Sequence, residues 1–282
     1  MSAANDQYAL GRSPHEYARL ARQAEIMKPM TRRLFADAGI GPGMTVLDLG
    51  SGAGDVAMLL AEMVGPQGKV IGLDLDHDAM RHARERALAA RFDNLSFVHS
   101  DFAHYRPDAP LDAMVGRFVL MYQADPAAAL EPLAKHLRPG GIAAFIEPWF
   151  RPLDGPDSVT KTAINCLIET FRRCGAHVDL GPRMHRVFQA AGLPVPEMRF
   201  EAMMDGHEDS PLYQYIADTM ESLLPKALEC GVPGADTLDI ASLPSQVRAE
   251  MKAAGYAITV ASIVRVWCRT SKAGISENSR MN

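Results

Sequence analysis

The spacing of apolar residues changes along the chain and predicts three kinds of region. Before residue 40, apolar residues recur every three or four positions, which is typical of amphipathic helices. Between about residues 45 and 146, short apolar runs alternate with helical stretches, which predicts strands alternating with helices. After Pro148 this alternation ends. Longer helical stretches then follow, until a final β-branched run at Ile258–Cys268.

The first region predicts two helices. Ser13 suits a helix cap, Pro14 suits the first helical position, and Glu16 completes a capping box. A second, short helix is predicted over Thr31–Ala38, and the turn Gly41–Gly43 ends it. We expect residues 1–40 to form a helical cap.

The middle region predicts a parallel sheet with helices on both faces, because strands and helices of this length alternate. A helix over Pro126–Leu137 is expected to end at the turn Arg138–Gly141. The five expected strands are Thr45–Leu49, Lys69–Leu73, Leu95–Val98, Ala113–Gly116 and Ile142–Ile146. We assign residues 41–150 to this α/β core.

The third region predicts helices that pack as a lid over one end of the sheet. Residues 151–256 are assigned to this lid, interleaved with late core elements over about 181–204. Residues 257–270 form the final core strand, and the polar tail 271–282 is expected to be disordered. The expected lid helices are Val159–Arg173, Pro182–Ala191, one beginning at Ser210–Pro211, and Pro244–Ala254, with a strand at Pro196–Met204.

Charge and cysteine content narrow the function classes. The formal net charge of the 282-residue chain is −5 and no long basic run occurs, so no nucleic-acid partner is expected. The four cysteines form no CxxC pair and no zinc-ligand spacing, so no metal is expected. There is no signal-peptide core and no membrane span. We therefore expect a cytoplasmic protein with a small-molecule substrate, and a homodimer remains open.

A glycine turn after the first strand is the strongest chemical signal. Gly50, Gly52 and Gly54 let the backbone bend and approach a ligand, and the following helix offers N–H groups to an anionic group. The same turn fits the dinucleotide pattern GxGxxA, with Asp74 at a suitable distance. A nicotinamide-dependent oxidoreductase is therefore an alternative at this point.

Three further features oppose the nicotinamide alternative. Asp48 precedes the turn, where it suits a cationic amino group and would repel a pyrophosphate. Asp101 and Phe102 follow the third strand, where a carboxylate and a backbone N–H can read an adenine edge. The run Leu137–Gly141 precedes the fifth strand and forms a turn that recurs in one enzyme class, described next.

Together these residues resemble the class I S-adenosylmethionine (SAM)-dependent methyltransferases of small molecules. The resemblance covers about residues 31–150. The segments Arg117–Tyr122 and Asp125–Pro126 are similar to the bacterial branch near the ubiquinone and menaquinone C-methyltransferases. It implies a Rossmann-like α/β sheet of seven strands, mostly parallel, with the last strand antiparallel.

The resemblance also implies the cofactor, SAM, with S-adenosylhomocysteine as product and no metal. Asp74 would accept hydrogen bonds from the ribose, Asp101 from the adenine amino group, and Gln23 of the N-terminal helix would reach the SAM carboxylate. Each aspartate has a structural alternative, because Asp often caps helices and turns. The implied cofactor residues are Asp48, Gly50, Ser51, Gly52, Asp74, Leu75, Asp101, Phe102, Arg117 and Gln23.

The acceptor side is expected after strands four and five and on the lid. Methyl transfer depends on alignment in a dry pocket and needs a base only if the acceptor loses a proton. The candidate bases are Glu147, Tyr122 and His177, and Glu147 could instead anchor the N-terminal helix. The candidate acceptor contacts are Phe118, Met121, Trp149 and Tyr213, although most such side chains pack in a core.

The leading hypothesis is methyl transfer from SAM to an O, N or C atom of an apolar, aromatic or polyketide-like metabolite, as in secondary metabolism. Three alternatives remain open. They are a SAM-binding cyclase that transfers no methyl group, the nicotinamide-dependent oxidoreductase, and a binding protein on an inactive methyltransferase scaffold.

Overall fold

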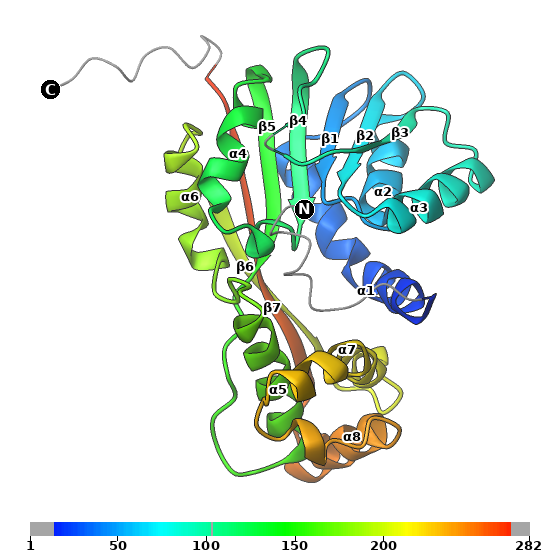
Figure 1. The fold of residues 1–282 in the computed structure, drawn as a ribbon, viewed down its shortest axis with the longest axis vertical. Helices are drawn as coiled ribbons and strands as arrows, with labels where there is room; N and C mark the ends of the chain where they lie inside the picture. The colour runs from blue at the N-terminus through cyan, green and yellow to red at the C-terminus, as the bar shows by residue number, and fades with distance from the viewer. Residues whose placement is uncertain (1–13, 103, 272–282) are drawn as a thin grey trace, which may run out of the picture.

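The computed structural model describes residues 14–102 and 104–271, and within them one sheet of seven strands runs in the order β3-β2-β1-β4-β5-β7-β6 (Figure 1). The neighbouring strands from β3 to β5 pair in parallel, whereas β7 pairs antiparallel with β5 and β6. The expected mostly parallel sheet with an antiparallel last strand is confirmed. The strands are β1 (Thr45–Leu49), β2 (Lys69–Asp74), β3 (Leu95–His99), β4 (Leu111–Arg117), β5 (Leu137–Pro148), β6 (Glu197–Asp205) and β7 (Ile258–Arg269).

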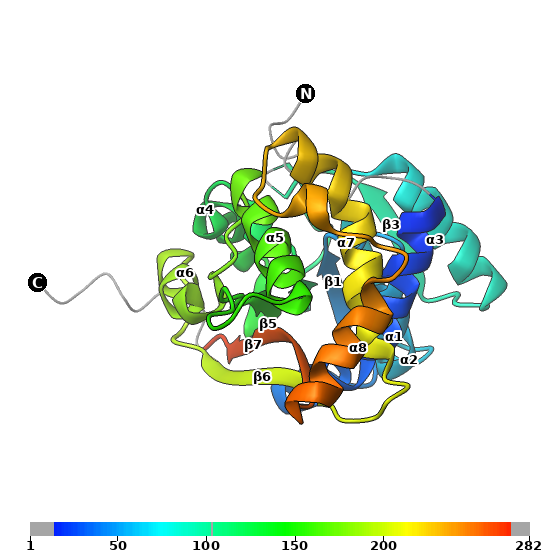
Figure 2. The same cartoon turned by 90° about the horizontal axis from the view of Figure 1, so that it is seen from below.

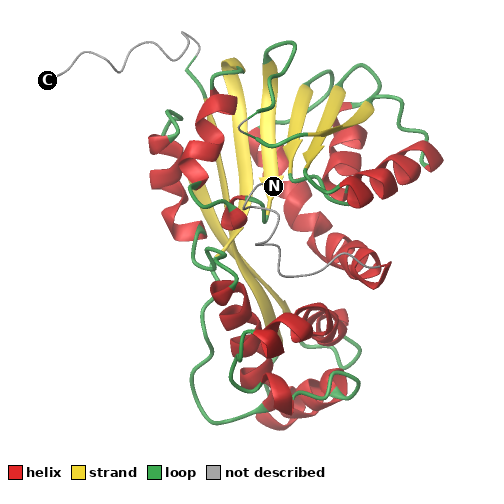
Figure 3. Ribbon diagram, in the orientation of Figure 1, coloured by secondary structure: helices red, strands yellow, loops and turns green. Residues whose placement is uncertain are grey.

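Helices cover both faces of the sheet and form a separate group below it (Figures 1 and 3). They are α1 (Pro14–Ala38), α2 (Asp55–Val64), α3 (His77–Ala89), α4 (Pro126–Ala134), α5 (Val159–Arg173), α6 (Met184–Ala190), α7 (Pro211–Glu229) and α8 (Leu243–Ala254), with short 3-10 turns η2 (Leu120–Tyr122), η3 (Gly181–Arg183) and η4 (Ala235–Thr237).

Two hydrophobic clusters form the core, one on each face of the sheet. Alternate residues of a strand point to opposite faces, so Val46 joins the cluster of α1, α2 and α3, while Leu47 joins that of α4 and α6. Both side chains are fully buried. The parallel strands are therefore apolar on both sides, as expected for a sheet covered by helices.

The helices α5, α7 and α8 form a third cluster, which we call the lid (Figure 2). The long strands β6 and β7 run from the sheet into this helical group (Figure 1). Ile258 and Val260, at the start of β7, pack into the lid cluster, whereas Val266 near its other end packs in the core. Strand β7 thus contributes residues to both bodies.

Several element boundaries differ from the sequence expectation. The two expected N-terminal helices are one helix, α1, which continues through Pro29. An internal proline removes one hydrogen bond and can kink a helix without ending it, and the buried apolar face continues through Met27, Met30 and Leu34. The proposed cap Ser13 and the tail after Ser271 lie outside the described residues.

The helix expected to run to Leu137 ends at Ala134, because Leu137 pairs with Leu111 as the first residue of β5. The glycine turn Arg138–Gly141 therefore lies within the strand. Leu111 N–H donates to the His136 carbonyl at 2.8 Å, which fixes this early start.

Candidate functional site

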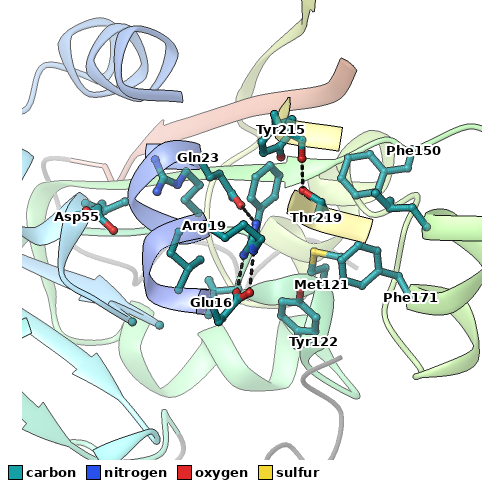
Figure 4. Close-up of a pocket in the computed structure, with 18 of the residues that line it drawn as sticks. Glu16, Arg19, Gln23, Asp55, Met121, Tyr122, Phe150, Phe171, Tyr215 and Thr219 are labelled. Atoms are coloured by element: carbon teal, nitrogen blue, oxygen red, sulfur yellow. Dashed lines mark hydrogen bonds and ion pairs between the residues drawn. The ribbon is translucent and has the colours of Figure 1, made fainter. Parts of the chain in front are cut away.

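A cavity of about 390 Å³ opens between the carboxyl ends of the strands, α1 and the lid (Figure 4). This is where open α/β sheets bind ligands. Its sheet-side wall is largely polar and comes from the ends of β1 and β2. Its lid-side wall is largely apolar and comes from α5, α7 and the residues after β4 and β5. We call these walls the polar half and the apolar half.

The polar half is organised by Asp74 at the end of β2. Gly52 N–H donates to Asp74 Oδ2 at 2.7 Å, and Asp76 N–H donates to Oδ1 at 2.9 Å. The carboxylate thus holds the glycine turn of β1 against β2. Burial is the main cause that raises the pKa of Asp74 above its usual value, and the two N–H donors oppose this shift.

The turn itself requires glycine at Gly50. Gly50 has φ +64°, and a Cβ atom there would lie 2.4 Å from Val119 Cγ2. Gly52 also has a positive φ, +50°. It differs from Gly50 because a Cβ atom there would meet no other atom within 4 Å. The space beside Gly52 belongs to the cavity, so a ligand can approach the backbone there.

Two buried polar atoms beside the turn fit a ligand with hydrogen-bond donors. Asp48 Oδ2 and Ser51 Oγ are buried and have no hydrogen-bond partner among the described residues. Buried polar groups are normally paired, so such atoms require an explanation. Burial raises the pKa of Asp48 well above its usual value, although Arg117 opposes the shift. Since Ser51 lines the cavity and Asp48 lies directly behind the turn, these residues suit the polar, partly cationic end of SAM.

Helix α1 closes this half with a buried polar cluster. Glu16 and Arg19 are almost fully buried, and the Arg19 guanidinium donates twice to the Glu16 carboxylate at 2.6 and 2.8 Å. Arg19 Nη1 also donates to Gln23 Oε1 at 2.6 Å. Figure 4 shows all three side chains on the cavity wall. Gln23, expected from the sequence to face the cofactor, therefore lies at the cavity.

The same helix is bonded to α7 of the lid. Arg22 forms an ion pair of 2.5 Å with Asp218, which is 3% exposed, and Gln214 donates to the other Asp218 oxygen at 2.8 Å. Ser222 Oγ donates to Glu16 Oε2 at 2.7 Å. The cap and the lid thus contact one another directly across the cavity.

Glu147 holds the turn after β4, where the two halves of the cavity meet. This carboxylate is fully buried in β5 and accepts hydrogen bonds from the N–H groups of Val119, Leu120 and Met121 at 3.2, 2.9 and 3.1 Å. Burial raises the pKa of Glu147 to about 8, and the three donors partly oppose the shift. Phe118, directly before them, has φ +53°, a conformation that non-glycine residues adopt mainly where surrounding structure enforces it.

This turn aims several side chains into the apolar half. Phe118, Met121 and Tyr122 all line the cavity. Tyr122 and Phe150 both pack near Phe171 of α5, with ring centroids 6.4 Å apart in each pair. Most of the remaining apolar wall comes from Leu153 and from the lid residues Ile164, Leu167, Ile168 and Ile216.

The structure brings together most of the cofactor residues expected from the sequence. Those on the cavity wall are Gln23, Gly50, Ser51, Gly52, Asp74, Leu75, Phe102 and Arg117. Asp48 is buried behind the turn, and Asp101 is half-buried beside Phe102 without lining the cavity. Burial lowers the pKa of Arg117, while Asp55 and Asp48 oppose this shift.

Four of the acceptor-side candidates lie off the cavity wall. Glu147, a candidate base, accepts three backbone hydrogen bonds and is not among the residues that line the cavity. It also anchors the turn after β4, not the N-terminal helix. His177 is bonded instead to the Gln123 carbonyl at 3.0 Å. Trp149 packs on Phe200, and Tyr213 is buried in the lid cluster.

Arg19 lines the cavity and was not among the site residues predicted from the sequence. Glu16, Arg19 and Gln23 extend the buried face of α1 that continues through Met27 and Met30. Charged residues on the same helix face as buried apolar residues could have indicated this site, because a buried charge needs a partner or a ligand. Tyr215 of α7 also lines the cavity, and burial raises its pKa while Arg19 and Arg117 oppose the shift.

Comparison with known proteins adds independent information. A family model described as a methyltransferase domain matches residues 40–192. Trans-aconitate 2-methyltransferase of Azoarcus sp. strain BH72 is 33% identical over 117 residues, which is 42% of this chain and 44% of that protein. Aklanonic acid methyltransferase of Streptomyces sp. strain C5 is 33% identical over 144 residues, covering 51% and 64%.

The ubiquinone/menaquinone biosynthesis C-methyltransferase of Xanthomonas campestris is 33% identical over 138 residues, covering 45% of this chain and 54% of that protein. The chain therefore spans about half the length of these curated relatives.

Solved structures share the fold across most of the chain. A SAM-dependent methyltransferase from Thiobacillus denitrificans, in complex with S-adenosylhomocysteine, has a TM-score of 0.50 and 23% identity and covers 85% of this chain and 90% of its own. The [4+2]-cyclase SpnF has a TM-score of 0.52 and 18% identity and covers 86% and 80%. At these identities the likeness shows the fold alone.

Proposed function

This chain belongs to the SAM-dependent methyltransferases, as the methyltransferase-domain match over residues 40–192 shows, and we propose that it methylates an apolar, aromatic or polyketide-like small molecule. The acceptor atom is an oxygen, nitrogen or carbon. One observation carries the proposal. A single cavity joins a polar half, built on Asp74 and the glycine turn, to an apolar half built on the lid.

SAM, when bound, supplies a methyl group on a positively charged sulfur. In the proposed binding mode, Asp74 accepts hydrogen bonds from the ribose hydroxyls, and Leu75 and Phe102 contact the adenine. Asp101, next to Phe102, is retained as the candidate for the adenine amino group. Supporting this mode, Leu75 and Phe102 line the polar half beside Asp74, and each Asp74 oxygen keeps acceptor capacity beyond its one N–H bond.

The residues at the methionine end act by charge and position. The buried Asp48 carboxylate favours a cationic amino group at the glycine turn, and Arg117 and the helix α2 N-terminus favour a carboxylate. Gln23, with one side-chain oxygen bonded to Arg19, can still donate from its amide. Helix α1 therefore completes the cofactor site.

The apolar half orients the acceptor and excludes water. Phe118, Met121 and Phe171 present apolar surface, and a dry pocket favours alignment of the two reacting groups. Tyr122 is the one candidate base from the sequence that lines the cavity; its hydroxyl can position an acceptor oxygen, and only its phenolate form can take the acceptor's proton. One relative is named as a methyltransferase of an organic acid, aklanonic acid, which agrees with a small-molecule acceptor.

The test is an assay with SAM and a panel of aromatic and polyketide-like acids, phenols and amines, read by mass spectrometry. Methyl transfer produces S-adenosylhomocysteine and a product heavier than the acceptor by one CH₂ unit. The proposal fails if no panel member yields both products. Tyr122→Phe in the same assay should retain cofactor binding and lose turnover if the hydroxyl acts on the acceptor.

A second candidate function is a cyclase that binds SAM without transferring its methyl group. Its supporting observation is the shared fold of SpnF, which extends over the lid-bearing 86% of the chain. The same assay separates the two candidates. A cyclase gives a product with the mass of its substrate and no S-adenosylhomocysteine.

A further inference from the structure

Two cysteines cap the carboxyl ends of α5 and α7, two lid helices whose ends are bonded together. Cys174 follows the last residue of α5 and Cys230 follows the last residue of α7, and both are half-buried free thiols. Arg173 holds the two helix ends together, since its Nη1 donates to the carbonyls of Cys230 at 2.7 Å and Gly231 at 3.0 Å.

The Cys230 thiol also acts on the pKa of Cys174. Burial is the main cause that raises the pKa of Cys174, and the neighbouring Cys230 thiol adds to the shift both by charge and by a hydrogen bond. The ammonium of Lys226 opposes the shift, so a positive charge lies close enough to stabilise a thiolate. Lys226 is itself paired with Glu229 at 2.9 Å.

The pair bridges the two hydrophobic bodies of the molecule. Cys174 packs against the core cluster of α4 and α6, whereas Cys230 packs against the lid cluster. Helix α7 carries Tyr215 and Ile216 on the cavity wall, so a bond at its carboxyl end would restrain a wall of the site.

We propose that Cys174 and Cys230 are a redox-modifiable pair that closes to a disulfide and restrains the carboxyl end of α7 against that of α5. The oxidant is a small-molecule disulfide such as oxidised glutathione. The thiolate of one cysteine attacks its S–S bond and releases one small thiol, and the second cysteine then attacks the mixed disulfide. Two protein thiols and one small disulfide become one protein disulfide and two small thiols, so atoms and electrons balance.

The other two cysteines serve as internal controls. Cys166 and Cys268 are 1% and 5% exposed, and burial raises the pKa of Cys268 to about 12. Thiolate character and access both govern exchange, so these two should stay reduced under conditions that close the Cys174–Cys230 pair.

The experiment treats the full chain with oxidised glutathione and maps disulfides by peptide mass spectrometry without reduction. The expected result is one Cys174–Cys230 cross-link, reversed by dithiothreitol and absent in Cys174→Ser and Cys230→Ser. Cys268→Ser should cross-link as the unaltered protein does. Amide hydrogen exchange in α7 should slow by about tenfold on oxidation, because the bond suppresses local opening.

Two results would overturn the proposal. In the first, both cysteines carry separate glutathione adducts and no cross-link forms at any oxidant concentration. In the second, the cross-link forms but exchange in α7 is unchanged, which removes the restraint. Neither readout requires SAM or an acceptor, so they do not depend on the proposed methyl transfer.

Discussion

The polar and apolar halves of the cavity are built in different ways. Side chains and backbone at the ends of β1 and β2 form the polar half, where Asp74 accepts hydrogen bonds of 2.7 and 2.9 Å. The apolar half comes largely from lid helices and aromatic packing, where the Phe150 and Phe171 ring centroids lie 6.4 Å apart. Hydrogen bonds fix one ligand geometry, whereas apolar walls accept many shapes of similar size. We therefore expect the polar half to define the cofactor and the apolar half to define the acceptor.

The largest effect on stability should follow from removing the Glu147 carboxyl, which holds the turn after β4. Glu147→Ala leaves three buried N–H groups without an acceptor and removes side-chain volume from a packed strand. We expect the free energy of unfolding to fall by about 3–5 kcal/mol. Urea denaturation measures this loss, with the exposed Glu131→Ala on α4 as the control. A loss no larger than that of the control would contradict the role of Glu147.

Glu147 should also make stability depend on pH. Its pKa is raised from 4.5 to about 8 in the folded protein, so the folded state holds a proton that the unfolded chain has released. This contribution is complete below pH 4.5 and is lost as pH rises through 8, on the order of a few kcal/mol. Glu147→Gln cannot titrate and should flatten the decline in unfolding free energy between pH 5 and about 8. An unchanged decline would show that the carboxyl is ionised throughout.

The next effect concerns the polar half alone. Asp74→Ala removes the acceptor for Gly52 N–H and Asp76 N–H together with the proposed ribose contact. Calorimetry should show affinity for S-adenosylhomocysteine reduced by about 100-fold. Asp78→Ala, an exposed acid on α3, is the matched control and should bind normally. Unchanged affinity in Asp74→Ala would remove the ribose assignment.

A smaller effect should appear in the apolar half. Leu167→Ala enlarges the lid side of the cavity without touching the glycine turn. We expect KM for the acceptor to rise by about tenfold, while the affinity for S-adenosylhomocysteine stays the same. The exposed Leu228→Ala on α7 controls for general changes in the lid. If cofactor affinity fell while KM for the acceptor rose, the two halves would not be separable.

The smallest effect should come from the contact between cap and lid. Arg22→Ala removes the ion pair with buried Asp218 and leaves Gln214 as one remaining donor. Release of S-adenosylhomocysteine should become about threefold faster, because α1 is held less firmly. Arg32→Ala, on the same helix but in an exposed pair with Glu62, should change nothing in a stopped-flow measurement.

The difference between the polar and apolar halves also explains which site residues could be predicted from the sequence. Parallel strands pair in register and their ends meet at one edge, so motif residues such as Asp74 and Gly50 could be placed from order alone. The alternation of strands and helices likewise predicted the sheet. The boundary errors at Pro29 and at Leu137 arose where tertiary pairing prevailed over local propensity.

The apolar half was harder to predict because helix faces in the lid meet through long-range packing. Trp149 and Tyr213 have suitable chemistry, but they pack on Phe200 and inside the lid cluster. Glu147 lies at the expected end of β5, yet the backbone turn after β4 encloses it. The orientations of these three side chains leave no local sequence pattern. Each depends on which segment, distant in the sequence, packs against the side chain.

The division of the cavity is tested most directly by a crystal structure of the protein grown with S-adenosylhomocysteine. We expect the adenine beside Leu75 and Phe102, the ribose hydroxyls on Asp74, and the sulfur atom facing the apolar half near Phe118 and Met121. A nucleoside bound elsewhere, or one whose sulfur points away from the lid, would contradict it.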